Sequence, residues 1–434
     1  MGSIMQIVCT VISKSVRLCP LIVGVTLCDV LSASPTTGLY VLVVLTFGAY
    51  LPNSLYPGYQ HAFGADDLTM TLIHAVFALV SAPALLLLSP VSDRFGARPV
   101  LRAGIVLAAL GSACFALAPG VEWLLVGRVA QGLALGATTG AAAALVSEET
   151  AGGGRRRGAV LSGIAFVAGT ALGAAVGGFL GQYAPAPYVL PFLLHLVLLA
   201  IAWYWVSALA PTTALAAGRI QHWRPTVPRI PRGMRALFAT ASAVGFLAWT
   251  TAGLFLAIIP ALLARSGRDN TAVTGCILGS VLLCSALTQP LVGRLGPRRA
   301  QLAGLAGLLV SLSLLSLTAG RSVSLTLAAA VVAGAGHGLA YAGAAAAVDA
   351  RAPGTERAAL TGALYLSFYL GSGLPALAVG LLTVPFSLTA TTCLVTSIAA
   401  ILVLLTSIAV AEVDKATRIP RIPSNGKIVY IKLK

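Results

Sequence analysis

Residues 89–101 read SPVSDRFGARPVL: one apolar run ends, a short charged turn follows, and a second apolar run begins. Residues 290–299 read PLVGRLGPRR, and four positions recur there at the same spacing, with Pro90, Arg94, Gly96 and Arg98 matching Pro290, Arg294, Gly296 and Arg298. Glycine permits the tight turn, and arginine beside an apolar segment stays in water near anionic headgroups. One copy alone fits any basic loop between two buried helices. The matched pair predicts a duplicated chain with a short cytoplasmic loop in each half.

The composition of the chain is that of a membrane protein. Of 434 residues, 58% are hydrophobic and only 9% are charged, whereas soluble domains carry about 25% charged residues. The net charge of +16 lies between apolar runs, as in loops at an anionic membrane surface, and not on one face of a polar domain. We therefore expect the lipid bilayer as a partner and no nucleic acid.

The sequence contains no pattern that indicates an enzyme. Its seven cysteines are scattered without paired or metal-ligand spacing, so we interpret them as packing residues. Motifs for zinc, haem, a dinucleotide or a catalytic nucleophile are absent from the sequence. We expect no cofactor, no metal and no catalytic residue.

Apolar runs of spanning length, about 20 residues each, follow one another from residue 38 onward. The expected spans are Gly38–Tyr56, Thr69–Leu88, Pro99–Ala118, Val121–Val146, Gly158–Gln182, Pro187–Leu209, Ala236–Leu263, Thr271–Gln289, Ala300–Thr318, Ser322–Ala347, Ala358–Leu382 and Ser387–Val410. The fold class is therefore an all-α membrane protein with twelve transmembrane helices in two six-helix pseudo-repeats.

Polar segments divide this chain into its expected parts. The first half covers residues 38–210, a Pro- and Arg-rich linker covers 211–235, the second half covers 236–410, and a polar tail covers 411–434. Residues 1–37 hold two apolar pieces that are too short to span, so we expect this segment to be non-spanning.

The basic residues predict the orientation of the chain in the membrane. Nearly all of the 28 Lys and Arg residues lie at the two ends, in the linker and in loops that follow even-numbered spans. The opposite loops hold only Arg265, Arg268 and Arg321. Positive charge favours the cytoplasmic side, so both termini and the linker are predicted to be cytoplasmic.

Three motifs carry a resemblance to the major facilitator superfamily over residues 38–410. The stretch SPVSDRFGARPVL resembles the signature loop of that family through Asp93, Arg94, Gly96 and Arg98, with Ser89 where the first Gly is usual. LLVGRVAQG in the fourth span is similar to its second motif. GTALGAAVGG in the fifth span resembles the GxxxGPxxGG motif of its proton-driven drug exporters, with Ala174 in place of Pro.

The resemblance implies alternating access gated by the signature loop and by the glycines of the fifth span. We expect Asp93 to meet the start of a neighbouring helix or an arginine of the other half, as part of a latch. Glycines four residues apart form a smooth stripe for close helix packing, although ordinary packing is an equally good reading of any one of them. The expected gating residues are Asp93, Arg94, Arg98, Gly169, Gly173 and Gly177.

The substrate cavity is expected where polar and aromatic side chains share one face of a span. The third, sixth, ninth and twelfth spans lack such a face and are expected to contact lipid, and we interpret His195 in the sixth span as a packing or interfacial residue. The expected substrate-binding residues are Tyr50, Asn53, His74, Gln131, Trp249, His337, Tyr341, Tyr365 and Tyr369. A mostly apolar, aromatic wall suits amphipathic or lipophilic organic molecules better than sugars.

No carboxylate of the sequence lies in the middle of a span, because all twelve acidic residues fall in loops, at span ends or in the N-terminal stretch. Coupling to protons therefore falls to Arg128 and His74, or to Asp66 and Asp67 at the outer mouth. Arg128 lies about two and a half turns inside its span, where an arginine needs a partner or a wet cavity, although it can also snorkel to the headgroups or bind backbone carbonyls.

The predicted function is export of small, fairly apolar organic molecules by proton antiport, from a multi-pass monomer in the cell membrane. The alternative is an importer or facilitator of the same fold without proton coupling, which the missing proline and the missing buried acid favour. A membrane receptor or scaffold without flux fits less well with the signature loop and the buried arginine.

Overall fold

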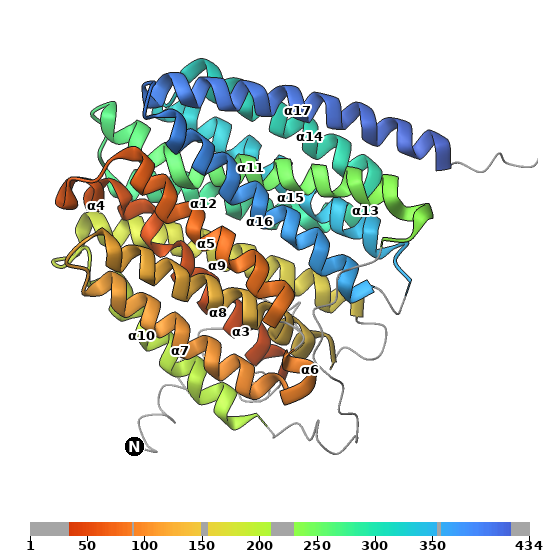
Figure 1. Ribbon diagram of the computed structural model, residues 1–434, viewed down its shortest axis with the longest axis horizontal. Helices are drawn as coiled ribbons and strands as arrows, with labels where there is room; N and C mark the ends of the chain where they lie inside the picture. Colours follow the sequence, from red (N-terminus) through yellow and green to blue (C-terminus); the bar gives the residue numbers. More distant parts are fainter. Residues whose placement is uncertain (1–33, 89–90, 149–154, 210–229, 354–356, 418–434) are drawn as a thin grey trace, which may run out of the picture.

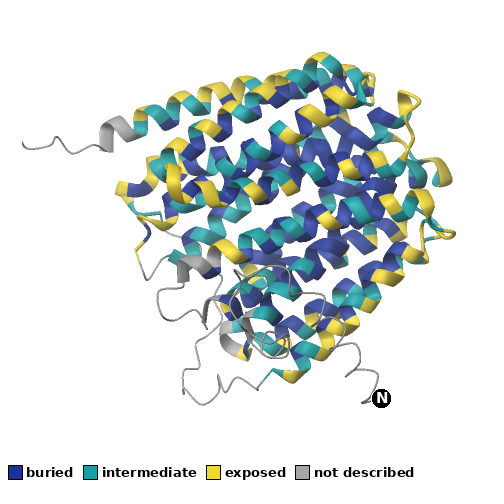
Figure 2. Ribbon diagram, turned by 180° about the vertical axis from the view of Figure 1, so that it is seen from behind, coloured by how far each residue is buried: buried dark blue, intermediate teal, exposed yellow. Residues whose placement is uncertain are grey.

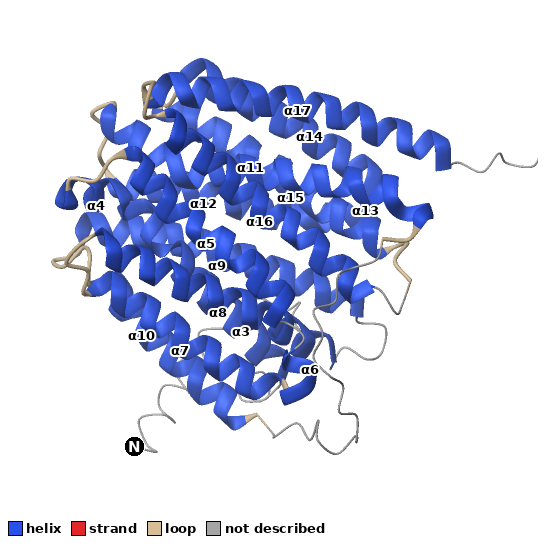
Figure 3. Cartoon of the chain, in the orientation of Figure 1, coloured by secondary structure: helices blue, strands red, loops and turns tan. Residues whose placement is uncertain are grey.

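The computed structural model describes residues 34–88, 91–148, 155–209, 230–353 and 357–417, and these residues form helices joined by short loops (Figure 3). Among them, twelve helical stretches are long and apolar enough to cross a membrane. This confirms the predicted all-α fold with twelve spans. The predicted non-spanning segment and most of the predicted linker lie outside the described residues.

The first half contains six spans and one short helix, α6, outside them. Its elements are α3 (Ser34–Tyr50), η1 (Leu51–Leu55), α4 (Tyr56–Phe63), α5 (Asp67–Leu88), α6 (Val91–Phe95), α7 (Ala97–Ala116), α8 (Val121–Glu148), α9 (Arg155–Tyr183) and α10 (Leu190–Ala208). The first span is broken: α3, η1 and α4 together form it.

The second half repeats this order. Its elements are η3 (Arg232–Met234), α11 (Arg235–Arg265), α12 (Thr271–Thr288), η4 (Gln289–Leu291), α13 (Val292–Leu295), α14 (Pro297–Thr318), α15 (Val323–Asp349), α16 (Arg357–Leu382) and α17 (Leu388–Thr417). The two halves lie side by side in Figure 1, the first below and the second above. Helix α17 continues through residues 411–417, which the sequence pattern assigns to the tail.

Burial separates inner from outer helices. The four least buried spans are α7, α10, α14 and α17, which are the third, sixth, ninth and twelfth, as predicted for spans that contact lipid. The first span and α11 are the most buried, and buried residues run through the centre of the bundle in Figure 2. The centre is therefore lined by helices that carry the predicted polar and aromatic residues.

The duplicated turns have the same geometry in both halves. Gly96 and Gly296 adopt φ values of 84° and 78° immediately before α7 and α14, a conformation that favours glycine. The following arginines each bind the end of the last span of their own half: Arg98 donates to the Ser207 carbonyl (2.7 Å), and Arg298 donates to the Ala411 carbonyl (3.2 Å). Ser207 lies in the last turn of α10, where carbonyls lack a helical partner, whereas Ala411 lies within α17, which continues to Thr417.

We call the end of the bundle that carries these arginines the basic end. The predicted latch at Asp93 and Arg94 cannot be placed there, because the side chains of these two residues lie outside the described part of the structure.

The glycine stripe of α9 packs against the first span of the same half. Gly169, Gly173 and Gly177 lie against Val43, Phe47 and Leu51, with no room for a side chain. In the second half Gly371 of α16 lies against Phe246 of α11 in the same way. Close packing of backbones across small residues is a common way to join membrane helices. In this structure the stripe joins helices within a half.

The two halves meet at the opposite end of the bundle, which we call the Asp66 end. There Gly178 of α9 faces α12: a Cβ atom on Gly178 would lie 2.5 Å from the Thr271 carbonyl and 2.7 Å from the Cα atom of Gly275. The Gln182 side chain also accepts a hydrogen bond from the Thr271 N–H (2.8 Å).

A salt bridge joins the halves at the same end. Arg265, which ends α11, binds both carboxylate oxygens of Asp67, which begins α5, at 2.7 and 2.8 Å. The neighbouring Asp66 caps α5, and hydrogen bonds from Thr69 lower the pKa of the Asp66 carboxyl. The Asp66 end is therefore closed in this structure.

We predict that Gly178→Val opens the Asp66 end. The added methyl groups overlap the α12 backbone, and overpacking of this kind costs about 1–3 kcal/mol, enough to shift an open–closed equilibrium roughly tenfold for each 1.4 kcal/mol. Distances between spin labels at Leu117 and Arg321, exposed residues of this end in the two halves, should lengthen. Gly293→Val is the matched control, because no described atom lies within 4 Å of its Cβ position. Unchanged distances in Gly178→Val would contradict the close contact.

Candidate functional site

The break in the first span removes one backbone hydrogen-bond donor. Pro52 has no N–H, so it can form neither an α-helical bond to Gly48 nor the alternative 3₁₀ bond to Ala49. Side chains of α8 donate to both carbonyls: Gln131 Nε2 donates to the Gly48 carbonyl (3.2 Å), and Arg128 Nη1 donates to the Ala49 carbonyl. The fourth span thus stabilises the broken backbone of the first, as a membrane interior requires.

Arg128 is fully enclosed in the first half, with 1% of its surface exposed. Besides Ala49 it donates to Asn53 Oδ1 (2.6 Å), Gln131 Oε1 (3.0 Å) and the Tyr56 hydroxyl (2.9 Å from Nε). Its partners among the described residues are thus neutral oxygens.

Three aromatic rings stabilise the same positive charge. The guanidinium carbon of Arg128 lies 5.4 Å from the ring centroids of Tyr56 and Phe115 and 5.5 Å from that of Phe77, within the range of cation–π attraction. The planar fork of arginine can use its donors and its faces together, which lysine cannot do.

His74 lies close to this cluster. It is buried in α5, its Nε2 has no hydrogen-bond partner among the residues that the structure describes, and the same holds for Asn53 Nδ2. His74 lies within electrostatic range of the Arg128 guanidinium. Arg128, Gln131, Asn53 and His74 therefore form one group inside the first half.

The remaining predicted residues form an aromatic group centred on the second half. The rings of Trp249 (α11) and His337 (α15) meet edge to face at 4.8 Å, and His337 stacks on Tyr341 at 5.6 Å. The Tyr341 and Tyr365 hydroxyls are 3.2 Å apart, and Phe368 contacts both rings at 5.2 Å.

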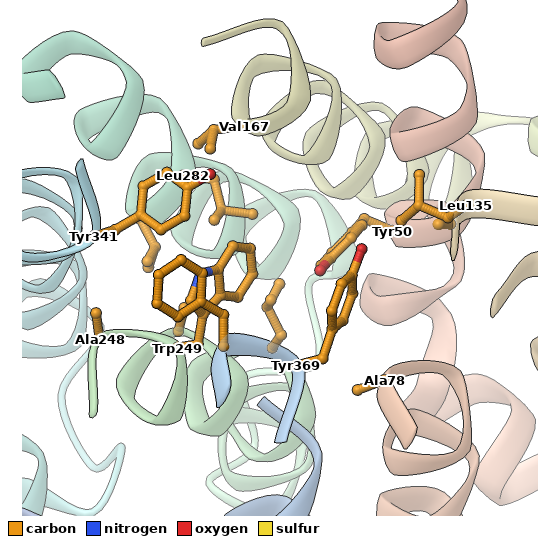
Figure 4. Close-up of a cluster of buried hydrophobic side chains, with 14 of the residues drawn as sticks. Tyr50, Ala78, Leu135, Val167, Ala248, Trp249, Leu282, Tyr341 and Tyr369 are labelled. Carbon is orange, nitrogen blue, oxygen red and sulfur yellow. The ribbon is translucent and has the colours of Figure 1, made fainter. Parts of the chain in front are cut away.

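Two contacts connect this aromatic group to the first half. Phe166 of α9 meets the Trp249 ring edge to face at 6.2 Å. Figure 4 shows Tyr50 beside Tyr369, and Tyr50 packs edge to face on Phe77 at 5.7 Å. Tyr50, Phe77, Trp249 and Tyr369 lie near the middle of their spans, so aromatic side chains of both halves meet at this depth, beside the close contact of Gly373 with Ala75 and Ala78.

The structure thus places the predicted binding residues in two groups that meet at Tyr50 and Tyr369. Sequence reasoning missed Tyr56, Phe166, Ser285 and Phe368, which complete these groups. Of these, only Tyr56 had a usable signal, because Pro52 marks a break that needs side-chain donors and acceptors nearby.

His195 lies in neither group. Its imidazole is fully buried between Ser112 Oγ (2.6 Å) and the Val44 carbonyl (3.0 Å), and its ring fills the space beside Gly48. It is a packing residue, as the sequence suggested.

Comparison with solved structures supports the fold. A bacterial homolog of the human lysosomal transporter Spinster, solved inward-facing and unoccupied, superposes with a TM-score of 0.66 over 87% of this chain and 97% of its own, at 14% identity. A POT family transporter in complex with 5-aminolevulinic acid superposes with a TM-score of 0.68 over 87% of this chain and 96% of its own, at 16% identity. At such low identity these structures show a shared fold alone.

Comparison with known sequences adds the family. The tetracycline resistance protein, class G, of Vibrio anguillarum is 29% identical over 248 residues, which are 54% of this chain and 60% of that protein, so the match spans less than two thirds of the relative. The model of the Major Facilitator Superfamily matches residues 38–267 and 241–428. Twelve spans in two repeated halves agree with this match, and the chain belongs to the Major Facilitator Superfamily of membrane transporters.

Proposed function

We propose that this transporter exports small, fairly apolar organic molecules by proton antiport with alternating access. The observation that carries the proposal is the aromatic contact between the halves, where Trp249 of the second half meets Phe166 of the first and Tyr369 lies beside Tyr50. Transporters built from repeats bind substrate near the membrane midplane between the repeats. An aromatic site with few polar groups suits planar or amphipathic molecules.

The roles of single residues in this proposal follow from their places. Tyr50, Asn53, His74, Gln131, Trp249, His337, Tyr341, Tyr365 and Tyr369 are the proposed substrate-binding residues. The proposed gating residues are Asp93, Arg94, Arg98, Gly169, Gly173 and Gly177. We assign proton coupling to Arg128 and His74, because both are buried in the first half and His74 Nε2 has no hydrogen-bond partner among the described residues.

The relative from Vibrio anguillarum, named for tetracycline resistance, supports export of such molecules. The glycine motif of α9 points the same way through its resemblance to that of proton-driven exporters. The second candidate, an importer or facilitator without coupling, is favoured by Ala174 in that motif and by the lack of an acidic residue at mid-span in the sequence.

Orientation is part of the same proposal. We assign the basic end, both termini and the linker to the cytoplasm and the Asp66 end to the outside of the cell membrane, in a monomer. Single cysteines are placed in the 211–235 linker and at Asp66, in a cysteine-free background. A membrane-impermeant maleimide should label the cysteine at Asp66 in intact cells and the linker cysteine only in inverted vesicles. Labelling of both from one side would contradict this topology.

The transport proposal predicts gradient-driven tetracycline uptake into inverted vesicles. An acidic lumen should drive accumulation several-fold above empty vesicles, and collapse of the pH gradient should abolish the excess. Equilibration at the same rate with and without the gradient would favour the facilitator. Binding without any flux would favour a receptor.

We predict that Arg128→Gln abolishes gradient-driven uptake, while Arg128→Lys leaves a remnant. Glutamine removes the charge, and lysine retains it but cannot bind Ala49, Asn53 and Tyr56 together. Unpaired partners cost about 1–3 kcal/mol each, so both variants should also melt at lower temperature while inserting normally.

The control for Arg128 is Arg102→Gln, which removes a partly exposed arginine that binds Ser207 and stacks on Trp203. Uptake by this variant should equal that of the wild type. Full gradient-driven uptake by Arg128→Gln would remove Arg128 from the mechanism.

A further inference from the structure

Two buried serine–histidine pairs occur in this protein, and they differ in one hydrogen bond. In the first half Ser112 Oγ lies 2.6 Å from His195 Nδ1, and His195 Nε2 lies 3.0 Å from the Val44 carbonyl. A carbonyl accepts only, so Nε2 carries the proton and Nδ1 accepts from the serine hydroxyl. Both nitrogens of His195 are satisfied.

The second pair leaves its other nitrogen without a partner. Ser285 Oγ lies 2.7 Å from His337 Nδ1, and the described residues offer the Ser285 hydroxyl no other acceptor. The hydroxyl therefore donates to Nδ1, and Nε2–H is a donor, as in His195. His337 is completely buried, and its Nε2 has no hydrogen-bond partner within the described ranges.

A second unpaired donor lies on the neighbouring ring. The indole Nε1–H of Trp249 is buried, with 6% of the residue exposed, and it too has no partner in the part of the chain that the structure describes. Indole can only donate. The Trp249 and His337 rings are 4.8 Å apart at 83°, so two N–H groups share one small region of the aromatic group.

The surroundings of these two donors are mostly aromatic and aliphatic. Phe166 and Tyr341 contact the Trp249 ring, and Phe368 contacts Tyr341. Leu282 belongs to the same buried cluster, as Figure 4 shows. Buried donors nearly always have a partner in folded proteins. The N–H groups of Trp249 and His337 are exceptions, and both residues lie near the middle of their spans, where the halves of a transporter separate to admit substrate.

We propose that Trp249 and His337 select planar aromatic substrates that carry hydrogen-bond acceptor oxygens, such as ring carbonyls or phenolates. The aromatic walls stack on the ring system, and the two N–H groups donate to its oxygens. This inference rests on the proposed transport function and names the substrate class of that site. It also separates the halves by role: the second half recognises the oxygens, while the donors of Arg128 remain bound to the first half.

A matched pair of ligands tests this selection. Anthraquinone-2-sulfonate and anthracene-2-sulfonate have the same three-ring plane and the same sulfonate, and they differ in two ring carbonyls. Binding of each to the purified full chain in lipid nanodiscs is measured by titration calorimetry. We expect the quinone to bind roughly tenfold more tightly, the gain of one or two buried hydrogen bonds.

Variants identify the donors. Trp249→Phe and His337→Phe retain an aromatic ring and remove one N–H each, so each should lower the ratio of the two affinities, to roughly threefold if the donors contribute equally, while anthracene-2-sulfonate binds as before. The double variant should bring the ratio close to one. Trp203→Phe, which removes an indole N–H from the exposed side of α10, should leave the ratio unchanged. Melting temperatures in the nanodisc establish that each variant is folded.

Three results would overturn the inference. They are equal affinities of the two ligands for the wild type, no binding of either ligand, or an equal loss of affinity for both ligands in the two donor variants. The last result would assign these rings to packing. The tetracycline flux assay is independent of this ratio. Tetracycline flux together with equal affinities for the two ligands contradicts the proposed substrate class alone. A tenfold difference in affinity without flux contradicts the proposed transport function alone.

Discussion

A membrane interior requires that every backbone N–H and carbonyl find a partner within the protein, and the first span is where this chain has to meet that requirement with side chains. Pro52 removes one backbone donor at the break, and Arg128 and Gln131 of α8 donate to the carbonyls of Ala49 and Gly48 beside it. The break turns Asn53 and Tyr56 toward the same guanidinium. A charged residue at this depth is therefore satisfied without a carboxylate, by neutral oxygens and aromatic faces.

The two halves share their packing but not their chemistry. The turns at Gly96 and Gly296, the arginines that follow them, and the contacts of Gly173 and Gly371 with the first span of each half are repeated. The correspondence of Phe47 with Phe246 puts Thr251 at the place of Pro52, and α11 runs unbroken there. The centre of the second half instead contains an aromatic group in which two buried N–H donors have no partner among the described residues. The helix packing is therefore shared by the two halves, whereas their buried polar and aromatic side chains differ.

Contacts between the halves differ at the two ends of the bundle. At the Asp66 end backbones approach each other across Gly178 and Gly275, and an ion pair joins Asp67 to Arg265. At the basic end the approach is made by side chains: Gln289 Oε1 would lie 3.3 Å from a Cβ atom on Gly163, and Leu86 lies at the same distance from one on Gly362. Side chains can move aside more readily than backbones. At these glycines the halves are therefore packed backbone to backbone at the Asp66 end and only through side chains at the basic end.

The sequence by itself determined the membrane location, the twelve spans and which four of them are least buried, because each depends on composition or on hydropathy within some 25 positions along the chain. It showed the duplication through two matching turns, at Gly96 and Gly296. It also selected most residues of both central groups by their spacing on single helices. Only the tertiary structure separated these residues into two groups, one around Arg128 and one around Trp249. Arg128 and Gln131 lie three residues apart on α8, as His337 and Tyr341 lie four apart on α15, and such spacings give no sign of which carbonyl, ring or hydroxyl lies opposite. Those partners come from helices distant in the chain, so the packing of the helices decided them.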